Sequence, residues 1–117
     1  MKPPPSVTIL TGELDLQASR SLGQRLNEEV GSGVQAGDLI LDLSSVSFMD
    51  SSALGVIIKA DQRLGRLGRG LALVAPEGSA AATVVGLTHM DRTLRVGTTR
   101  ADAEAALGDT PDAPTPS

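Results

Sequence analysis

The stretch DLILDL at residues 38–43 is a nearly continuous run of aliphatic side chains. A strand that is covered on one face alternates apolar and polar residues, whereas a strand that is buried on both faces has no such alternation. Strands of the second kind are usually parallel to their neighbours, and parallel neighbours are joined by long crossovers. This run therefore predicts a mostly parallel sheet that is covered on both faces.

The rest of the chain alternates strand patterns with helix patterns. The strands are predicted at residues 6–10, 38–43, 71–75 and 93–96. The helices are predicted from residue 16 to the glycines at 31 and 33, at 53–67, from Pro76 to 87, and at 99–107. In the second helix the apolar stripe consists of Ile57, Ala60, Leu64 and Leu67. Four strands that alternate with about four helices predict a single α/β domain with right-handed crossovers.

The composition excludes several classes of function. The chain has one Phe and neither Trp nor Tyr, and its net charge is −4, so binding to nucleic acid is not expected. It has no Cys and one His, which excludes zinc–thiolate sites and disfavours a histidine metal site, and no cofactor is expected. No apolar run reaches about 18 residues, and MKPPPS lacks the apolar segment of a signal peptide. We therefore expect a cytoplasmic protein without a membrane span.

Two polar clusters directly follow predicted strands. TGELD at residues 11–15 follows the first strand, with Gly12 in a predicted turn, and FMDSS at residues 48–52 follows the second strand. Because the carboxyl ends of parallel strands gather at one edge of a sheet, the two clusters are expected to lie close together there. Asp15 is predicted to cap the helix that follows it.

The sequence Asp50-Ser51-Ser52 leaves two interpretations open. Asp and Ser are preferred caps at the start of a helix, so the three residues are compatible with a purely structural role. A serine in the first turn of a helix is also well placed to carry a phosphate, because free backbone N–H groups favour an anion there. A phosphate would add about −1.5 to −2 charge at pH 7.

A serine hydrolase is a further possibility. Ser51 or Ser52, together with His89 and Asp15, supplies the residue types of a catalytic triad. The chain lacks the G-x-S-x-G turn that exposes the nucleophile in α/β hydrolases, and it is small for a substrate pocket. The sequence therefore favours a binding protein over an enzyme.

Five motifs resemble those of the STAS domain family, and within it the bacterial anti-sigma factor antagonists. They are TGELD, LILDLSSVSFMDSSALGVII, RLGRLGRGLALVAP, VVGLTHMDRTLRV and TRADAEAAL. The resemblance covers about residues 6–107, between a proline-rich N-terminus at 1–5 and a tail at 108–117 that is expected to be disordered. It implies a STAS-like α/β domain with a four- to five-stranded sheet.

The resemblance also implies a function. Anti-sigma factor antagonists bind an anti-sigma factor that is a serine kinase of the histidine-kinase-like ATPase fold, and this binding releases a sigma factor. By analogy, Ser51 is the phosphorylation site, a phosphatase of the PP2C type reverses the modification, and Ser52 is only its neighbour. The implied partner-binding residues are Asp15, Asp50, Ser51, Ser52 and Ala53. The alternative within the family is a scaffold or interaction module that is not phosphorylated.

The chain departs from the family pattern at three places. Ala53 stands where the family usually has glycine, and His89 and Met90 stand where glycine and leucine are common. The family also has a strand before the one at residues 6–10, and here only MKPPP precedes it. We therefore expect residues 6–10 to form an exposed edge of the sheet and the protein to be a monomer or a weak dimer.

Overall fold

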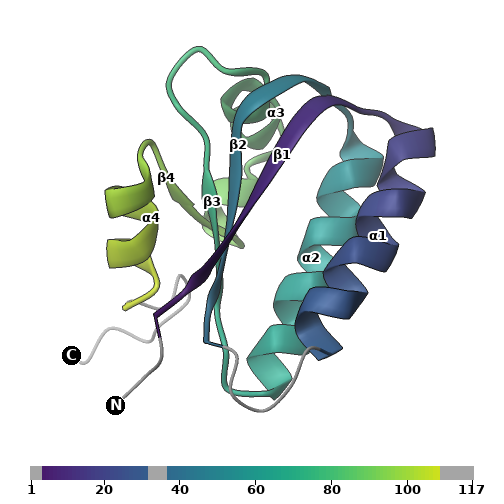
Figure 1. Cartoon of the computed structure of the whole chain (residues 1–117). Coiled ribbons are helices and arrows are strands. Elements are labelled where there is room, and N and C mark those ends of the chain that lie inside the picture. Colours follow the sequence, from purple (N-terminus) through teal and green to yellow (C-terminus); the bar gives the residue numbers. More distant parts are fainter. Residues whose placement is uncertain (1–3, 32–36, 109–117) are drawn as a thin grey trace.

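The computed structural model describes residues 4–31 and 37–108 of the chain, and all structural statements below refer to these residues (Figure 1). The strands are β1 (Ser6–Leu14), β2 (Leu39–Met49), β3 (Leu71–Val74) and β4 (Arg95–Gly97). The helices are α1 (Leu16–Gly31), α2 (Ser51–Arg66), α3 (Ala80–Thr88), the short 3₁₀ helix η1 (Met90–Arg92) and α4 (Arg100–Ala106). The predicted alternation of strands and helices is confirmed.

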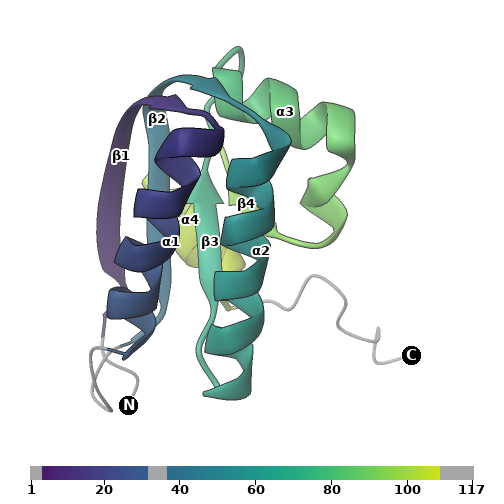
Figure 2. The ribbon, with the colours of Figure 1, turned by 90° about the vertical axis from the view of Figure 1, so that its right-hand side faces the viewer.

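The four described strands form one sheet in the order β1-β2-β3-β4, and each pairs in parallel with its neighbours. Figures 1 and 2 show α1 and α2 side by side on one face of this sheet, and α4 on the opposite face. Apolar residues of α3 belong to the same core as those of α1 and α2. The predicted α/β class and the parallel sheet are thus confirmed.

The aliphatic run in β2 lies at the centre of the domain. Leu41 and Leu43 are fully buried in the larger core beneath α1 and α2. Ile40 belongs to a smaller core on the other face, where it lies with Ala103 of α4. Burying one such side chain contributes roughly 1.5–3 kcal/mol, and here both faces of one strand do so. The absence of alternation in the sequence is explained by this double coverage.

The first strand is longer than predicted. β1 continues through TGEL to Leu14, because β2 also runs on to Met49 and offers a partner along that length. Gly12 has a φ of 78°, in the region that favours glycine, and it lies where the register between the two strands shifts. The prediction of a turn at Gly12 was therefore wrong. The glycine accommodates an irregularity within a strand.

Two helix boundaries also differ from the prediction. α3 begins at Ala80 and not at Pro76, because the Ser79 hydroxyl caps it by accepting the Ala82 N–H at 3.1 Å. Gly78 just before it has a φ of 77°, which interrupts helical geometry. The second difference concerns the C-terminal end of α2. This helix ends at Arg66, and Leu67 lies outside the stripe with 59% of its surface exposed. Ile57, Ala60 and Leu64 are buried as predicted.

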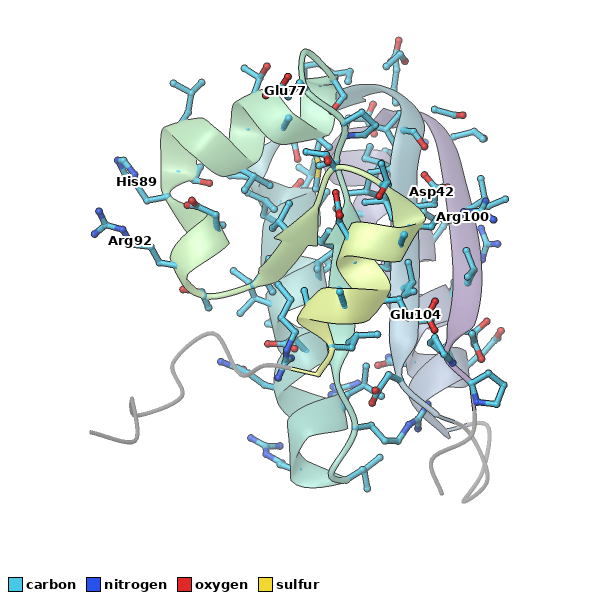
Figure 3. The ribbon with its side chains drawn as sticks, turned by 90° about the vertical axis from the view of Figure 1, so that its left-hand side faces the viewer. Asp42, Glu77, His89, Arg92, Arg100 and Glu104 are labelled. Carbon is cyan, nitrogen blue, oxygen red and sulfur yellow. The ribbon has the colours of Figure 1, made fainter. Side chains whose placement is uncertain are left out.

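An ion pair fastens α4 to the sheet. Arg100 Nε donates to Asp42 Oδ2 of β2 at 2.9 Å, and Figure 3 shows the two residues side by side. Burial raises the pKa of Asp42. Hydrogen bonds from Ser44 and Arg100, together with the charge of Arg100, outweigh this effect and hold the pKa below its usual value. Asp42 is therefore ionised at neutral pH. Its carboxylate lies in the otherwise apolar interface beneath α4, where Ser44 and Arg100 satisfy it with hydrogen bonds.

Candidate functional site

The two polar clusters lie together at the carboxyl ends of β1 and β2. Leu14 pairs with Met49, and the backbone N–H of Asp50 donates to the Leu14 carbonyl at 3.2 Å. Asp15 directly follows β1 and Asp50 directly follows β2. The two residues therefore lead into α1 and α2 at the same end of the sheet (Figure 1). The predicted juxtaposition of the clusters is confirmed.

Asp15 caps α1 as predicted. Its Oδ1 accepts the backbone N–H of Ala18 at 2.9 Å, which is the position three residues into the helix that a capping carboxylate reaches. The residue is half-buried. Its carboxylate therefore has a structural role that accounts for its presence.

Asp50 caps α2 more extensively. Its Oδ1 accepts the backbone N–H of Ser52 at 3.0 Å and that of Ala53 at 3.3 Å, and it also accepts the Ser52 hydroxyl. The Ser52 hydroxyl is the main cause that lowers the pKa of Asp50. Backbone N–H groups of Ala53, Ser52 and Leu16 lower it further, against a smaller rise from burial. Asp50 is therefore a carboxylate at neutral pH, as its capping role requires.

The two serines have different surroundings. Ser51 is the first residue of α2 and is exposed, and within residues 4–31 and 37–108 its hydroxyl has no hydrogen-bond partner. Ser52 is half-buried and donates its hydroxyl to Asp50, and its Oγ lies 3.4 Å from Oγ of Ser19. The Ser19 hydroxyl in turn donates to the Leu16 carbonyl at 2.7 Å. The Ser52 hydroxyl is therefore engaged with Asp50, whereas the Ser51 hydroxyl is exposed.

Comparison with known proteins identifies the family of this chain. The family model described as the STAS domain matches residues 3–103. The chain belongs to the STAS domain family. Anti-sigma-F factor antagonist RsfB from Mycobacterium tuberculosis is 30% identical to this chain over 98 residues, which are 84% of this chain and 77% of that protein.

Solved structures share the fold. An anti-sigma factor antagonist from Mycobacterium paratuberculosis superposes with a TM-score of 0.76 at 28% identity, covering 90% of this chain and 86% of that chain. The unphosphorylated anti-sigma factor antagonist SpoIIAA superposes with a TM-score of 0.64 at 20% identity, covering 84% of this chain and 83% of that one. At that identity the second likeness concerns the fold alone.

Ala53 does not lie on the surface of this STAS domain. Its side chain is fully buried in the core beneath α2, and only its backbone N–H takes part in the site, through the bond to Asp50. Of the five residues expected to bind a partner, the exposed one is Ser51, whereas Asp15, Asp50 and Ser52 are half-buried.

Two apolar residues beside the site were not among those predicted. Leu16, which follows Asp15, is 66% exposed, and Phe48, two residues before Asp50, is 48% exposed. Phe48 pairs with Glu13 near the end of β1, and Leu16 begins α1 just after that strand, so both residues lie close to the polar clusters in the sequence. A signal for Phe48 was present in the sequence, because it is the single aromatic residue of a chain whose core is otherwise aliphatic. Exposed aromatic residues are enriched among the anchors of protein interfaces.

His89 does not assemble a catalytic triad with the serines. It ends α3 with its side chain exposed, and Figure 3 shows it pointing away from the domain. Among the described residues no hydrogen bond joins it to Asp15, Ser51 or Ser52.

The described part of the chain contains no cluster of three or more His, Asp or Glu residues suited to a metal ion. None of its helices is long and apolar enough to cross a membrane.

We predict that His89→Gly stabilises the domain. His89 has a φ of 56°, in the left-handed region where a side chain costs about 1 kcal/mol relative to glycine. Because the imidazole is exposed, its removal should cost little. Urea denaturation should show a gain of about 1 kcal/mol for His89→Gly. His89→Ala is the control, since it removes the ring but keeps Cβ, and an equal gain in both variants would contradict the backbone explanation.

Proposed function

We propose that this STAS domain is an anti-sigma factor antagonist whose binding to an anti-sigma factor is controlled by phosphorylation of Ser51. The observation that carries the proposal is the free, exposed hydroxyl of Ser51 beside the hydrogen-bonded hydroxyl of Ser52. The name of the relative RsfB supports the same role, as an antagonist of the anti-sigma-F factor. The proposed activity is regulatory binding, without catalysis by this chain.

The family resemblance extends this proposal to the partners. The anti-sigma factor would be a serine kinase with a histidine-kinase-like ATPase fold that phosphorylates Ser51, and a phosphatase of the PP2C type would remove the phosphate. Capture of the kinase by the unphosphorylated form would release the sigma factor that the kinase holds. These exchanges would take place in the cytoplasm.

The capping geometry supports a switch that acts at the surface and does not refold the domain. Asp50 already accepts the N–H groups of Ser52 and Ala53, so a phosphate on Ser51 would not need to replace an existing cap. It would instead place about −1.5 to −2 charge beside the Asp50 carboxylate at an exposed position. Bulk and negative charge at that point would oppose a partner that contacts this surface.

The surroundings of Ser51 are suited to such contact. Leu16 and Phe48 supply exposed apolar surface near the carboxyl ends of β1 and β2, and Asp15 and Asp50 are their close neighbours in the sequence. Apolar anchors next to a small number of polar groups are typical of the central part of a protein interface. A charge introduced at Ser51 would therefore lie on the same end of the domain as this apolar surface, within the proposed contact area.

The site of phosphorylation can be tested with three matched proteins. Wild type, Ser51→Ala and Ser52→Ala are expressed in the source cells with a tag, recovered, and mapped by mass spectrometry. We expect phosphate on Ser51 in wild type and in Ser52→Ala, and none in Ser51→Ala, because the Ser52 hydroxyl is bonded to Asp50. Because Ser51→Ala cannot be phosphorylated at this position, it should retain the kinase, which is then identified among the proteins that co-purify with it.

The result can also contradict the proposal. Phosphate on Ser52 in wild type would mean that Ser52, and not Ser51, is the modified residue. If all three proteins carry no phosphate and retain the same partners, the DSS motif is a helix cap only. The domain would then be a constitutive scaffold or interaction module.

A further inference from the structure

The outer edge of β1 has no partner strand within residues 4–31 and 37–108. β1 is the first strand in the sheet order and pairs only with β2, and Figure 2 shows it along one side of the sheet. The strand runs for nine residues, from Ser6 to Leu14. A long strand edge presents unpaired N–H and C=O groups that can pair with another strand.

Val7 and Ile9 present both their backbone and their side chains at this edge. The N–H of Ser6 donates to the Asp38 carbonyl on the β2 side at 2.9 Å, and successive residues of a strand point in opposite directions. The backbone groups of Val7 and Ile9 therefore point outwards. Their side chains are 41% and 50% exposed, whereas the intervening Thr8 is buried.

The features that usually protect a strand edge are missing from this segment. Charged side chains, prolines and bulges discourage pairing between edges. Residues 4–12 contain no charged side chain, and the prolines end at Pro5, before the strand begins. The register irregularity of β1 lies beyond Ile9. Residues 6–9 are thus a regular, uncharged edge with two exposed aliphatic side chains.

We propose that two copies of this chain associate by antiparallel pairing of β1 with β1 across a two-fold axis at Thr8. In this register Val7 of each copy lies opposite Ile9 of the other, and each such pair exchanges two backbone hydrogen bonds. The four aliphatic side chains then pack as cross-strand neighbours on one face, and the two Thr8 residues meet on the other. A second copy fits because the segment is complementary to itself and carries no charge to oppose the contact.

The contact should be weak and reversible. Only a short segment of each copy takes part, so the buried area falls below the roughly 1,200 Å² of a stable interface. The paired segment lies at the start of β1, whereas Ser51 follows the opposite, carboxyl ends of the strands, so the dimer leaves Ser51 accessible. The inference is therefore independent of the proposed function.

Sedimentation velocity and amide hydrogen exchange together test the pairing. The chain is measured from about 10 µM to about 1 mM. For a dissociation constant of about 100 µM, a plausible value for so small an interface, about one fifth of the chains are monomeric at the upper concentration. The average mass should rise, and exchange at the Val7 and Ile9 amides should slow about fivefold. Thr8, whose amide faces β2 in the regular part of the ladder, should be protected at every concentration.

A matched pair of double variants locates the contact. Val7→Lys with Ile9→Lys places like charges opposite each other across the proposed axis and should remain monomeric throughout. Leu67→Lys with Leu87→Lys makes the same chemical change at residues that are 59% and 78% exposed elsewhere, and it should dimerise like wild type.

Three results would overturn the proposal. One is a monomer at about 1 mM. Another is a dimer in which exchange at Val7 and Ile9 does not change with concentration, which would place the contact on another surface. The third is protection of these two amides at about 10 µM while the chain sediments as a monomer, which would mean that the chain covers its own edge.

Discussion

Replacing Ser51 by glutamate is expected to weaken binding to the anti-sigma factor about 100-fold, which corresponds to about 2.7 kcal/mol. The substitution places a negative charge on the exposed first residue of α2, next to the Asp50 carboxylate and within the proposed contact area. Introducing an unmatched charge into an interface costs a few kcal/mol. The expected loss therefore needs no change in the fold.

The stability of the variant separates this explanation from unfolding. A glutamate in the first turn of a helix interacts favourably with the helix dipole, so Ser51→Glu should be as stable as wild type or slightly more stable. Titration calorimetry with the purified partner measures the affinity, and urea denaturation measures the stability. A loss of affinity together with a loss of stability would count against occlusion at the surface.

Ser51→Gln is the matched control for charge. Glutamine has the shape of glutamate without its charge, so it reports the steric part of the effect alone. We expect a smaller loss of affinity for Ser51→Gln than for Ser51→Glu, and near wild-type affinity for Ser51→Ala. Equal losses for the glutamate and glutamine variants would mean that bulk alone occludes the site. Unchanged affinity in all three variants would show that Ser51 lies outside the interface.

The sequence was sufficient to predict the arrangement of the site. The run without alternation at residues 38–43 predicted a strand buried on both faces, and the structure buries Leu41 on one face and Ile40 on the other. Once the sheet is parallel, chain order alone requires the segments after two neighbouring strands to meet at one edge. This is why the amino-acid sequence alone placed Asp15 and Asp50 together, as the hydrogen bond between Asp50 and Leu14 confirms.

The exposure of single residues and the ends of elements could not be predicted in the same way. β1 continues beyond residue 10 because β2 extends beside it, which is a tertiary effect that the local pattern around Gly12 does not contain. The difference between Ser51 and Ser52 depends on which hydroxyl reaches Asp50, and both have the same composition-based preference for a helix start. The exposure of Leu16 likewise depends on which elements cover the strand ends.

Replacing Gly97 by alanine is expected to lower the free energy of unfolding by about 3 kcal/mol. A Cβ at Gly97 would lie 2.4 Å from the backbone nitrogen of Ala103 and 2.8 Å from Cβ of Asp102, both in α4. The helix cannot easily move away, because Arg100 is bonded to the buried Asp42 and Ala103 is fully buried. Either α4 leaves the sheet, and these interactions are lost, or β4 is displaced from β3.

Gly86→Ala is the control for the same chemical change. Gly86 lies in α3, and a Cβ there would meet no atom within 4 Å, so the better helix propensity of alanine should raise the stability by up to about 1 kcal/mol. Urea denaturation of both variants should thus give effects of opposite sign. Faster amide exchange in α4 of Gly97→Ala would identify release of that helix as the response. If Gly97→Ala is as stable as wild type, α4 does not pack closely against Gly97 at the end of β4.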